Sequence, residues 1–326
     1  QHEINTGNAV PIRQPPRRLP FGKRQIEKDE IQRMLKLGVI EPSTSSWSSP
    51  VVLIAKKGGQ GGTRFCVDFR GVNGLMTEKI AYPIPRIDDC LDALSTASFY
   101  GCMDLNSGFW QLEMKESDKE KTAFATSQGL YQFIVMPFGL ANAPNSFQRL
   151  MESVLRGLQW EECLLYLDDI IVPASTVQES IERLEHVFQR LLDAGLKLKP
   201  SKCIFFQKKV KFLGHIVSEN GIQTDPEKTE AVQKWPRPKN QKQMRSFLGL
   251  CSYYRRFVSK FAEIARPLHK LCEKYAAFNW TDICEEAFTR LKEVLTSPPI
   301  LGYPIIKSKF ILDTDASDKA LGAVLS

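Results

Sequence analysis

A chain of 326 residues is longer than one compact core usually organises, so two or more subdomains are expected. Hydrophobic residues make up 43% and charged residues 25%, which is ordinary for a globular protein, and no stretch approaches the roughly 20 apolar residues of a membrane helix. The net charge of +7 favours a polyanionic partner only weakly, because the distribution of the charged residues matters more than their total. These numbers exclude a membrane-spanning protein and leave nucleic acid open as a partner.

The cysteines and histidines argue against a zinc site. Eight cysteines are scattered, mostly within apolar runs, without a CxxC pair, and none of the four histidines is spaced as a zinc ligand. We therefore expect buried free thiols in a reducing compartment. Because the chain begins at Gln1 rather than Met, we also expect it to be a piece of a longer polypeptide.

The first predicted element is an extended N-terminal arm over residues 1–23, which are rich in Pro and Arg and have no periodicity. An amphipathic helix is expected over 24–37, and a glycine-rich turn is expected to join strands at 51–57 and 63–69. The later elements expected, in chain order, are a helix over 85–94, a strand over 99–105, a hairpin over 122–136, a helix over 145–155, an acidic hairpin over 164–172, a helix over 176–194, short strands over 203–206 and 210–217, a mainly helical region over 225–295 and a strand over 309–313. The order strand, helix, hairpin, helix, strand in the middle is compatible with a split βαβ sheet.

Three aspartates stand at the ends of strongly apolar runs. Asp104 follows one such run, and Asp168 and Asp169 lie between two others, where a hairpin would place them at its tip. A carboxylate beside a core strand is costly to desolvate unless something pairs with it. If the strand of Asp104 lies beside the hairpin, the carboxylates converge on shared cations, and hard oxygen ligands favour two Mg²⁺ ions, with Mn²⁺ as an alternative.

Each acidic position also has a purely structural explanation. Asp favours turns, so Asp168 and Asp169 suit a hairpin turn without any further role. Asp104 suits an N-cap for the segment that begins at Asn106. Spacing alone leaves both alternatives open.

Five sequence blocks follow one another along nearly the whole chain. They are residues 67–70 with Asn73, 103–111, 136–144 with the following Phe147 and Gln148, the Tyr-Leu-Asp-Asp box at 166–169, and 212–215. In this order they resemble the reverse transcriptases of long-terminal-repeat retroelements, most closely the gypsy type. A single such block is a weak signal, whereas five in register are specific.

The resemblance implies an α/β (α+β) right-hand polymerase with fingers, a ferredoxin-like (RRM-like) palm and a helical thumb. It implies that Asp104, Asp168 and Asp169 are the catalytic metal ligands. The implied divisions are fingers at 24–82 and 113–142, palm at 83–112 and 143–224, thumb and connection at 225–304, and a truncated start of a ribonuclease H domain at 305–326.

The resemblance also implies a nucleotide pocket. Lys57 and Arg64 match fingers positions that contact the triphosphate, where charge-assisted hydrogen bonds explain the basic side chains. Phe109 matches the steric gate that excludes a ribose hydroxyl, and Phe138 and Gln148 complete the pocket. Retroviral enzymes carry glutamine where this chain has Phe138, so a hydrogen bond from this position to the nucleotide is in doubt. A solvated charge at Lys57 and core packing of Phe109 are the alternatives.

Duplex contacts are expected in two places. The primer grip of the family is matched by Phe212, Leu213, Gly214 and His215. Basic and aromatic residues interleave in the region 228–274, which fits a thumb that grips a duplex backbone without reading sequence, although a solvated face over an aromatic core is a compatible alternative. The expected template–primer contacts there are Lys242, Arg245, Arg255 and Arg256.

Asp315, in the segment 312–318, matches the first metal ligand of the family's ribonuclease H domain. Because that activity needs acidic residues from later strands, we expect this chain alone not to degrade the RNA of a hybrid.

The expected function is that of an RNA- and DNA-templated DNA polymerase, which extends a primer 3′-hydroxyl with dNTPs on an RNA/DNA hybrid or a DNA duplex. Oligomerisation, linkage to protease, ribonuclease H and integrase in a Pol polyprotein, and location in a cytoplasmic virus-like particle or, with an integration complex, in the nucleus are further expectations. A domesticated, non-catalytic nucleic-acid-binding module is the main alternative, and the intact acidic triad argues against it. A nuclease leaves the fingers and primer-grip blocks unexplained.

Overall fold

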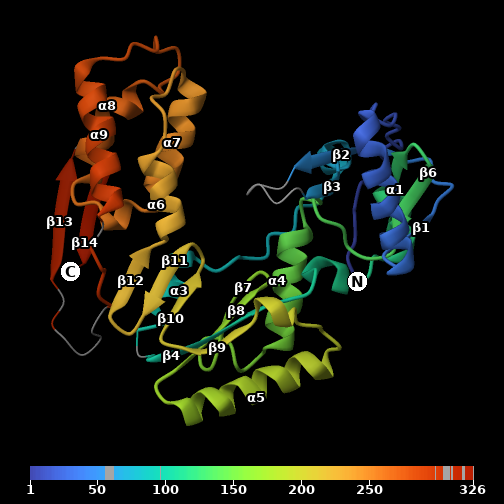
Figure 1. The fold of residues 1–326 in the computed structure, drawn as a ribbon, viewed down its shortest axis with the longest axis horizontal. Helices are drawn as coiled ribbons and strands as arrows, with labels where there is room; N and C mark the ends of the chain where they lie inside the picture. The colour runs from blue at the N-terminus through green and yellow to red at the C-terminus, as the bar shows by residue number, and fades with distance from the viewer. Residues whose placement is uncertain are drawn as a thin grey trace. The chain divides into compact units, whose positions relative to one another are not determined.

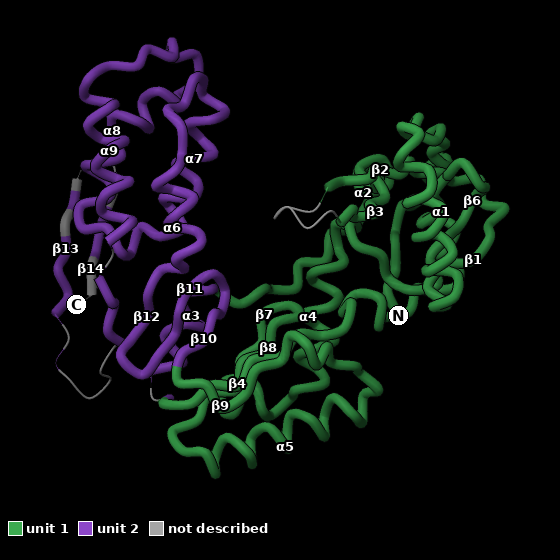
Figure 2. Tube along the Cα trace, in the orientation of Figure 1, with its two compact units in different colours: residues 1–86, 98–208 green, residues 87–97, 209–326 purple. Residues whose placement is uncertain are grey.

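The computed structural model describes residues 1–55, 62–95, 97–297, 299–303, 309, 311–317 and 320–325. The chain divides into two compact units, each built from two separate stretches (Figure 2). Unit 1 comprises residues 1–86 and 98–208, and unit 2 comprises residues 87–97 and 209–326. Within the described part of the chain, every helix is too short or too polar to span a bilayer.

The first sheet of unit 1 has five strands in the order β1-β6-β5-β2-β3, in which only the β2–β5 pair is parallel. The strands are β1 (Ile40–Pro42), β2 (Ser49–Ala55), β3 (Thr63–Val67), β5 (Phe124–Thr126) and β6 (Gly129–Phe133). Helix α1 (Phe21–Lys36) starts three residues earlier than predicted, and its Ile31 and Met34 join the same core as Val51 and Leu53 of β2. A short helix, α2 (Arg70–Leu75), follows β3.

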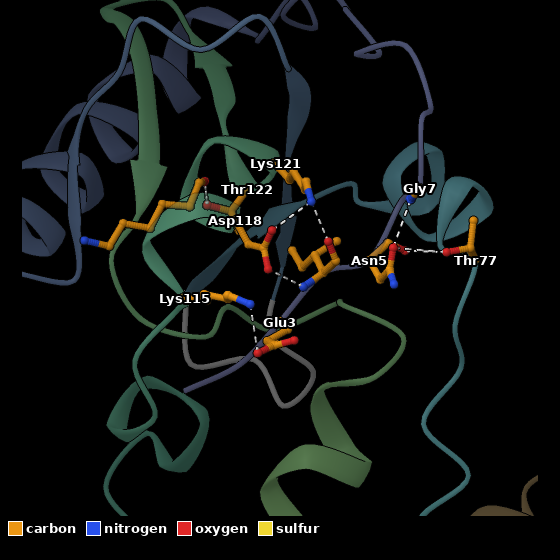
Figure 3. A network of polar contacts seen from close by, with 10 residues as sticks. Glu3, Asn5, Gly7, Thr77, Lys115, Asp118, Lys121 and Thr122 are labelled. Carbon is orange, nitrogen blue, oxygen red and sulfur yellow. Dashed lines mark hydrogen bonds and ion pairs between the residues drawn. The ribbon is translucent and has the colours of Figure 1, made fainter.

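The N-terminal segment runs extended along unit 1 and is hydrogen-bonded to it (Figure 3). His2 forms a parallel β-bridge with Met114, and the Ile4 side chain is completely buried. The backbone N–H of Ile4 donates to a carboxylate oxygen of Asp118 at 2.9 Å, and the ammonium of Lys121 donates to the Ile4 carbonyl at 2.6 Å. The first residues are thus part of the fold of unit 1, with partners more than a hundred positions away.

The second sheet of unit 1 is antiparallel, with the order β7-β8-β4-β9. Its strands are β4 (Phe99–Asp104), β7 (Leu164–Tyr166), β8 (Asp169–Ala174) and β9 (Ile204–Gln207), with helix α4 (Ala143–Val154) between β4 and β7 and helix α5 (Val177–Asp193) between β8 and β9. This is the order strand, helix, hairpin, helix, strand that the sequence predicts, and the sheet order is that of a ferredoxin-like fold. The Thr176 side chain accepts a hydrogen bond from the Glu179 N–H at the start of α5, and Gly195 follows its end with a φ of 67°, so both ends carry ordinary capping signals.

Unit 2 contains a three-stranded antiparallel sheet, helices and a terminal hairpin (Figure 1). The elements are α3 (Ile87–Asp92), β10 (Lys209–Phe212), β11 (His215–Ser218), β12 (Gly221–Thr224), α6 (Pro226–Gln233), α7 (Gln241–Tyr253), α8 (Phe261–Lys270), α9 (Asp282–Thr296), β13 (Leu312–Ser317) and β14 (Ala320–Leu325). The expectation of one strand over 210–217 is wrong, because the chain turns at Leu213 and Gly214, whose φ angles are 45° and 70°. The strand expected over 309–313 corresponds to β13, which begins at Leu312.

Candidate functional site

The acidic residues meet at one end of the second sheet of unit 1. Asp104 ends β4 and Asp169 begins β8, and the antiparallel register places these two residues directly opposite each other. Asp168 precedes Asp169 in the two-residue turn that joins β7 to β8. The strand of Asp104 therefore lies beside the acidic hairpin, as the prediction required.

The turn has an unusual backbone at the residue before Asp168. Leu167 adopts a left-handed φ of 57°, which a bulky residue rarely takes. Such conformations cost free energy and persist only where neighbouring contacts hold them, so they gather at functional sites. Here the backbone N–H of Leu167 donates to the side-chain oxygen of Gln148 at 2.7 Å.

The negative charges of the site favour the binding of a cation. Desolvation of the carboxyl by surrounding protein, followed by the negative charges of Asp168 and Asp104, raises the pKa of Asp169 to about 6. Lys202 opposes this shift, and its ammonium lies 2.6 Å from Oδ2 of Asp104. One positive side chain thus partly neutralises three negative ones.

The donor set fits a hard divalent cation. Among the described residues, no three His, Cys, Asp or Glu side chains lie close enough together to hold a metal as they stand, and Lys202 occupies the cationic position beside Asp104. Carboxylate oxygens are the ligands that Mg²⁺ and Mn²⁺ prefer. Desolvation, and after it the charges of Asp168 and Asp104, raise the pKa of Asp169, and a bound cation would offset both effects. The carboxylate donors are therefore compatible with the predicted Mg²⁺ or Mn²⁺. A metal ion bound at Oδ2 of Asp104 would have to displace the Lys202 ammonium.

A cleft of about 630 Å³ opens beside the acidic residues. Its lining includes Asp104, Asp168, Lys202 and Phe138, together with the exposed Arg64 of β3. Arg64 therefore lies where a triphosphate contact was predicted. Lys57, the other predicted contact, lies outside the described residues.

Phe138 lines the cleft, and the rings of Phe109 and Phe147 pack behind it without lining the cleft themselves. Phe109 stacks on Phe138 with their centroids 5.0 Å apart and their planes 29° apart, and it also contacts Phe147 at 5.3 Å. Phe138 is 53% exposed, whereas Phe109 is half-buried. Gly108 leaves the space that Phe147 fills, since a Cβ there would lie 2.9 Å from that ring. The side chain of Phe138 thus supports the expected gate residue by stacking.

Gln148 differs from its expected place. The sequence predicted a nucleotide contact, but this residue is completely buried and is absent from the lining of the cleft. Its amide is used within the protein, by Leu167 on one side and by Glu152, at 2.7 Å, on the other. The sequence motif included Gln148, but it did not indicate the direction of its side chain.

In unit 2, the segment 212–215 forms the tight turn between β10 and β11. Tyr253, the last residue of α7, and Tyr254, which follows it, donate their hydroxyls to the carbonyls of Leu213 and Gly214, respectively. The ring of His215 lies 5.3 Å from that of Tyr253, and burial lowers its pKa. The sequence marked these tyrosines only as aromatic residues among basic ones, and their role in holding the turn was missed.

The four basic residues expected to contact the duplex fall into two groups. Arg256 forms ion pairs with Asp88 and Asp92 of α3, at 3.0 and 3.2 Å, and Arg245 donates to the Cys272 carbonyl at 2.9 Å. Lys242 and Arg255 are exposed, and their side chains have no partner among the described residues. Arg256 and Arg245 thus have structural bonds that the sequence did not indicate.

Asp315 lies in β13, opposite Gly322 of β14. The position of its side chain lies outside the described residues.

Two family models match the chain. One, described as reverse transcriptase (RNA-dependent DNA polymerase), matches residues 54–217, about half of the chain. The other, described as an RNase H-like domain found in reverse transcriptase, matches residues 280–326 and so includes α9. The sequence divisions had placed α9 in the thumb and connection.

Curated relatives cover nearly the whole chain. In Drosophila melanogaster, the Pol polyproteins of transposons 412, 297 and gypsy are 40%, 41% and 38% identical over 95%, 100% and 94% of the chain. The chain spans only 25%, 31% and 31% of these relatives. The predicted gypsy-type resemblance is thus confirmed for a segment of such polyproteins.

Solved structures give the same result. A foamy viral protease-reverse transcriptase in complex with double-stranded DNA matches 99% of this chain and 57% of its own, with a TM-score of 0.88 and 26% identity. Another, in complex with an RNA/DNA hybrid, matches 97% of this chain and 42% of its own, with a TM-score of 0.82 and 26% identity. From the matched family, its relatives and the fold, the chain belongs to the reverse transcriptase (RNA-dependent DNA polymerase) family.

Proposed function

We propose that this chain is the polymerase part of a gypsy-type reverse transcriptase and extends a primer 3′-hydroxyl with dNTPs on RNA and DNA templates. The observation that carries the proposal is the register of the second sheet, which pairs Asp104 with Asp169 and places Asp168 in the adjoining turn. No purely structural role explains why three carboxylates share one end of a sheet at the cost of a raised pKa.

In this proposal Asp104 and Asp168 hold two Mg²⁺ ions, and Asp169 completes the triad. When bound, such ions lower the pKa of an attacking hydroxyl and stabilise the leaving pyrophosphate. Arg64, which lines the cleft, donates hydrogen bonds to the triphosphate. The Phe109 ring, which stacks on the cleft residue Phe138, excludes a ribose hydroxyl. Lys57 is proposed as a second triphosphate contact.

The proposed nucleic-acid partners are an RNA/DNA hybrid and a DNA duplex. The solved foamy viral enzymes that resemble this chain were captured with such duplexes, which supports the proposal. Lys242 and Arg255 are the proposed backbone contacts, because both are exposed cations without protein partners among the described residues. The segment 212–215 is proposed as the primer grip.

The divisions into fingers, palm, thumb and ribonuclease H remain proposals, as do a cytoplasmic virus-like particle and polyprotein linkage. All eight cysteines are free thiols, and each is buried or half-buried, which supports a reducing compartment.

Primer extension with Mg²⁺ on RNA and DNA templates tests the proposed function. Asp104→Asn and Asp168→Asn are each expected to lower extension at least ~100-fold, as losses at metal sites do, while duplex affinity changes little. Asp193→Asn, at the exposed end of α5, is the matched control and should extend like the wild type. Extension by either catalytic variant at the wild-type rate would refute the assignment, and duplex binding by a wild type that never extends would favour a non-catalytic module.

A further inference from the structure

A row of hydrogen bonds runs from a surface cleft to the catalytic turn. Tyr82 donates its hydroxyl to Oε2 of Glu152, and Gln148 donates its amide N–H to Oε1 of the same carboxylate at 2.7 Å. The Gln148 oxygen then accepts the Leu167 N–H at 2.7 Å. No two of these three hydrogen bonds share a donor or an acceptor atom, so all three are present at once.

The row begins at a surface cleft, passes through the buried Gln148 side chain and ends at the half-buried Leu167. Tyr82 and Glu152 line a cleft of about 820 Å³. Gln148 is completely buried, and Leu167 directly precedes Asp168. The bonds therefore link three separate segments of unit 1: the chain before α3, helix α4 and the β7–β8 turn.

Glu152 decides how the Gln148 amide is oriented. A glutamine amide presents an oxygen acceptor at one side and an NH₂ donor at the other, and only the oxygen can accept the Leu167 N–H. The Glu152 carboxylate accepts but cannot donate, so it binds the NH₂ group and turns the oxygen toward the turn. Tyr82 holds the carboxylate in place from the other side.

The turn depends on this orientation. Leu167 has a left-handed φ of 57°, which is unfavourable for leucine without support from its surroundings. Leu167 is half-buried, and leaving its N–H without an acceptor is also unfavourable, so losing the Gln148 oxygen would favour a different turn. Any such change moves Asp168, the next residue.

We propose that Glu152 is a positioning residue of the polymerase, which fixes the Gln148 amide and through it the turn that carries Asp168, with Tyr82 as its anchor. Glu152 and Tyr82 stand outside the sequence blocks that carry the family resemblance. The inference rests on the proposed polymerase function for its kinetic consequence, but not for its structural one.

The test compares Glu152→Leu with Glu152→Gln. The leucine variant cannot orient the amide and is expected to lower kcat about tenfold, with the KM for dNTP changed less than about twofold, because reacting groups are misplaced while the nucleotide contacts remain. Glutamine keeps one acceptor for Gln148, and its NH₂ can bond the Tyr82 oxygen, so it should restore most of kcat. Glu161→Leu, an exposed acid of the same unit, is the matched control.

Amide hydrogen exchange of the peptide over 164–172, measured without metal or nucleic acid, gives a second readout that needs no activity. Exchange at the turn should be faster in Glu152→Leu and near wild type in Glu152→Gln and Glu161→Leu. Tyr82→Phe removes one hydroxyl only and should show the same effects at about one third of the size, which keeps the test valid if the leucine variant does not fold. The inference would be overturned if both Glu152→Leu and Tyr82→Phe left kcat and the amide exchange of the turn unchanged. If the wild type did not extend primers but Glu152→Leu still exchanged faster, the result would count against the proposed polymerase function and not against the positioning role of Glu152.

Discussion

The ammonium of Lys202 lies 2.6 Å from Oδ2 of Asp104, so a cation of the protein stands at a proposed metal ligand. The Lys202 side chain is 53% exposed and comes from the short η3 turn (Pro200–Lys202), whereas the Asp104 side chain is only 21% exposed. An ammonium and a divalent ion cannot share one position on a carboxylate oxygen. We therefore expect Lys202 to compete with a metal ion for Oδ2 of Asp104.

Lys202→Met is expected to tighten Mn²⁺ binding about two- to fivefold in the absence of nucleic acid, since a partly exposed ion pair contributes less than ~1 kcal/mol. Electron paramagnetic resonance of free Mn²⁺ measures this affinity directly. Lys199→Met is the control, because Lys199 lines the same cleft without an ion pair to Asp104. Equal affinities in the wild type and Lys202→Met would show that the pair does not compete.

The raised pKa of Asp169, about 6, predicts a pH-dependent effect of Asp169→Asn on stability. A carboxyl whose pKa is higher in the folded than in the unfolded state destabilises the fold when it is ionised, that is above about pH 6, and this penalty disappears as the pH falls toward the unfolded value near ~4. Asp169→Asn should therefore stabilise the metal-free protein at pH 7.5 by up to about 1 kcal/mol, a figure reduced because the residue is exposed.

Thermal melts in EDTA at pH 7.5, 6 and 4.5 would measure the difference between Asp169→Asn and the wild type. The difference should be largest at pH 7.5, smaller at pH 6 and only about a third of its full size at pH 4.5, because it vanishes only below the unfolded pKa. A gain that grows as the pH falls has the opposite sign and would contradict the raised pKa.

Local signals explain which parts of the fold the sequence predicted. Apolar runs marked β4 and the β7–β8 hairpin, while Thr176 and Gly195 marked the ends of α5, and the structure places each of these near its predicted position. The contacts that were missed join residues far apart in sequence. Asp118 accepts the Ile4 N–H from 114 positions away, and no periodicity near Ile4 indicates this.

The same distinction applies to the site. The acidic residues could be predicted because they interrupt apolar strands, but Lys202 reaches Asp104 from 98 positions away, without any pattern in its own segment. The turn within 210–217 was missed because Leu213 is apolar and reads as strand, although it takes a positive φ of 45°. Side-chain direction, as at Gln148, depends on partners that only the folded chain brings together.

Duplex binding should distinguish Lys242 and Arg255, which have no partner among the described residues, from the ion-paired Arg256. Lys242→Gln and Arg255→Gln are each expected to lower the slope of log Kd against log salt by about 1, because each removes one phosphate contact. Arg256→Gln should leave the slope unchanged and lower the melting temperature, since Arg256 holds Asp88 and Asp92.

Fluorescence anisotropy with a labelled duplex across a salt series measures these slopes. A lower slope in Arg256→Gln, without any loss of thermal stability, would assign Arg256 to the duplex instead of to α3.

Gly108→Ala tests how closely Gly108 is packed between the Phe147 ring and Asp168. An added Cβ would lie 2.9 Å from Cζ of Phe147 and 3.5 Å from Cβ of Asp168, so the ring must shift. Overpacking of this kind costs about 1–3 kcal/mol, and we expect a loss of stability together with slower extension. Gly249→Ala, in α7 with open space around it, is the control and should stabilise by about 0.5–1 kcal/mol. Urea unfolding measures both changes, and a neutral Gly108→Ala would contradict the close packing.

The stacked pair of Phe109 and Phe138 predicts a graded loss of sugar discrimination. Phe109→Ala removes the ring expected to exclude a ribose hydroxyl, and it should lower the dNTP-to-rNTP ratio of kcat/KM at least ~10-fold. Phe138→Ala leaves that ring but removes its stacking partner 5.0 Å away, so a smaller loss of about threefold is expected. The exposed Phe21, at the start of α1, provides the control substitution Phe21→Ala. If Phe138→Ala loses discrimination while Phe109→Ala keeps it, the gate is the exposed ring itself and Phe109 only supports it.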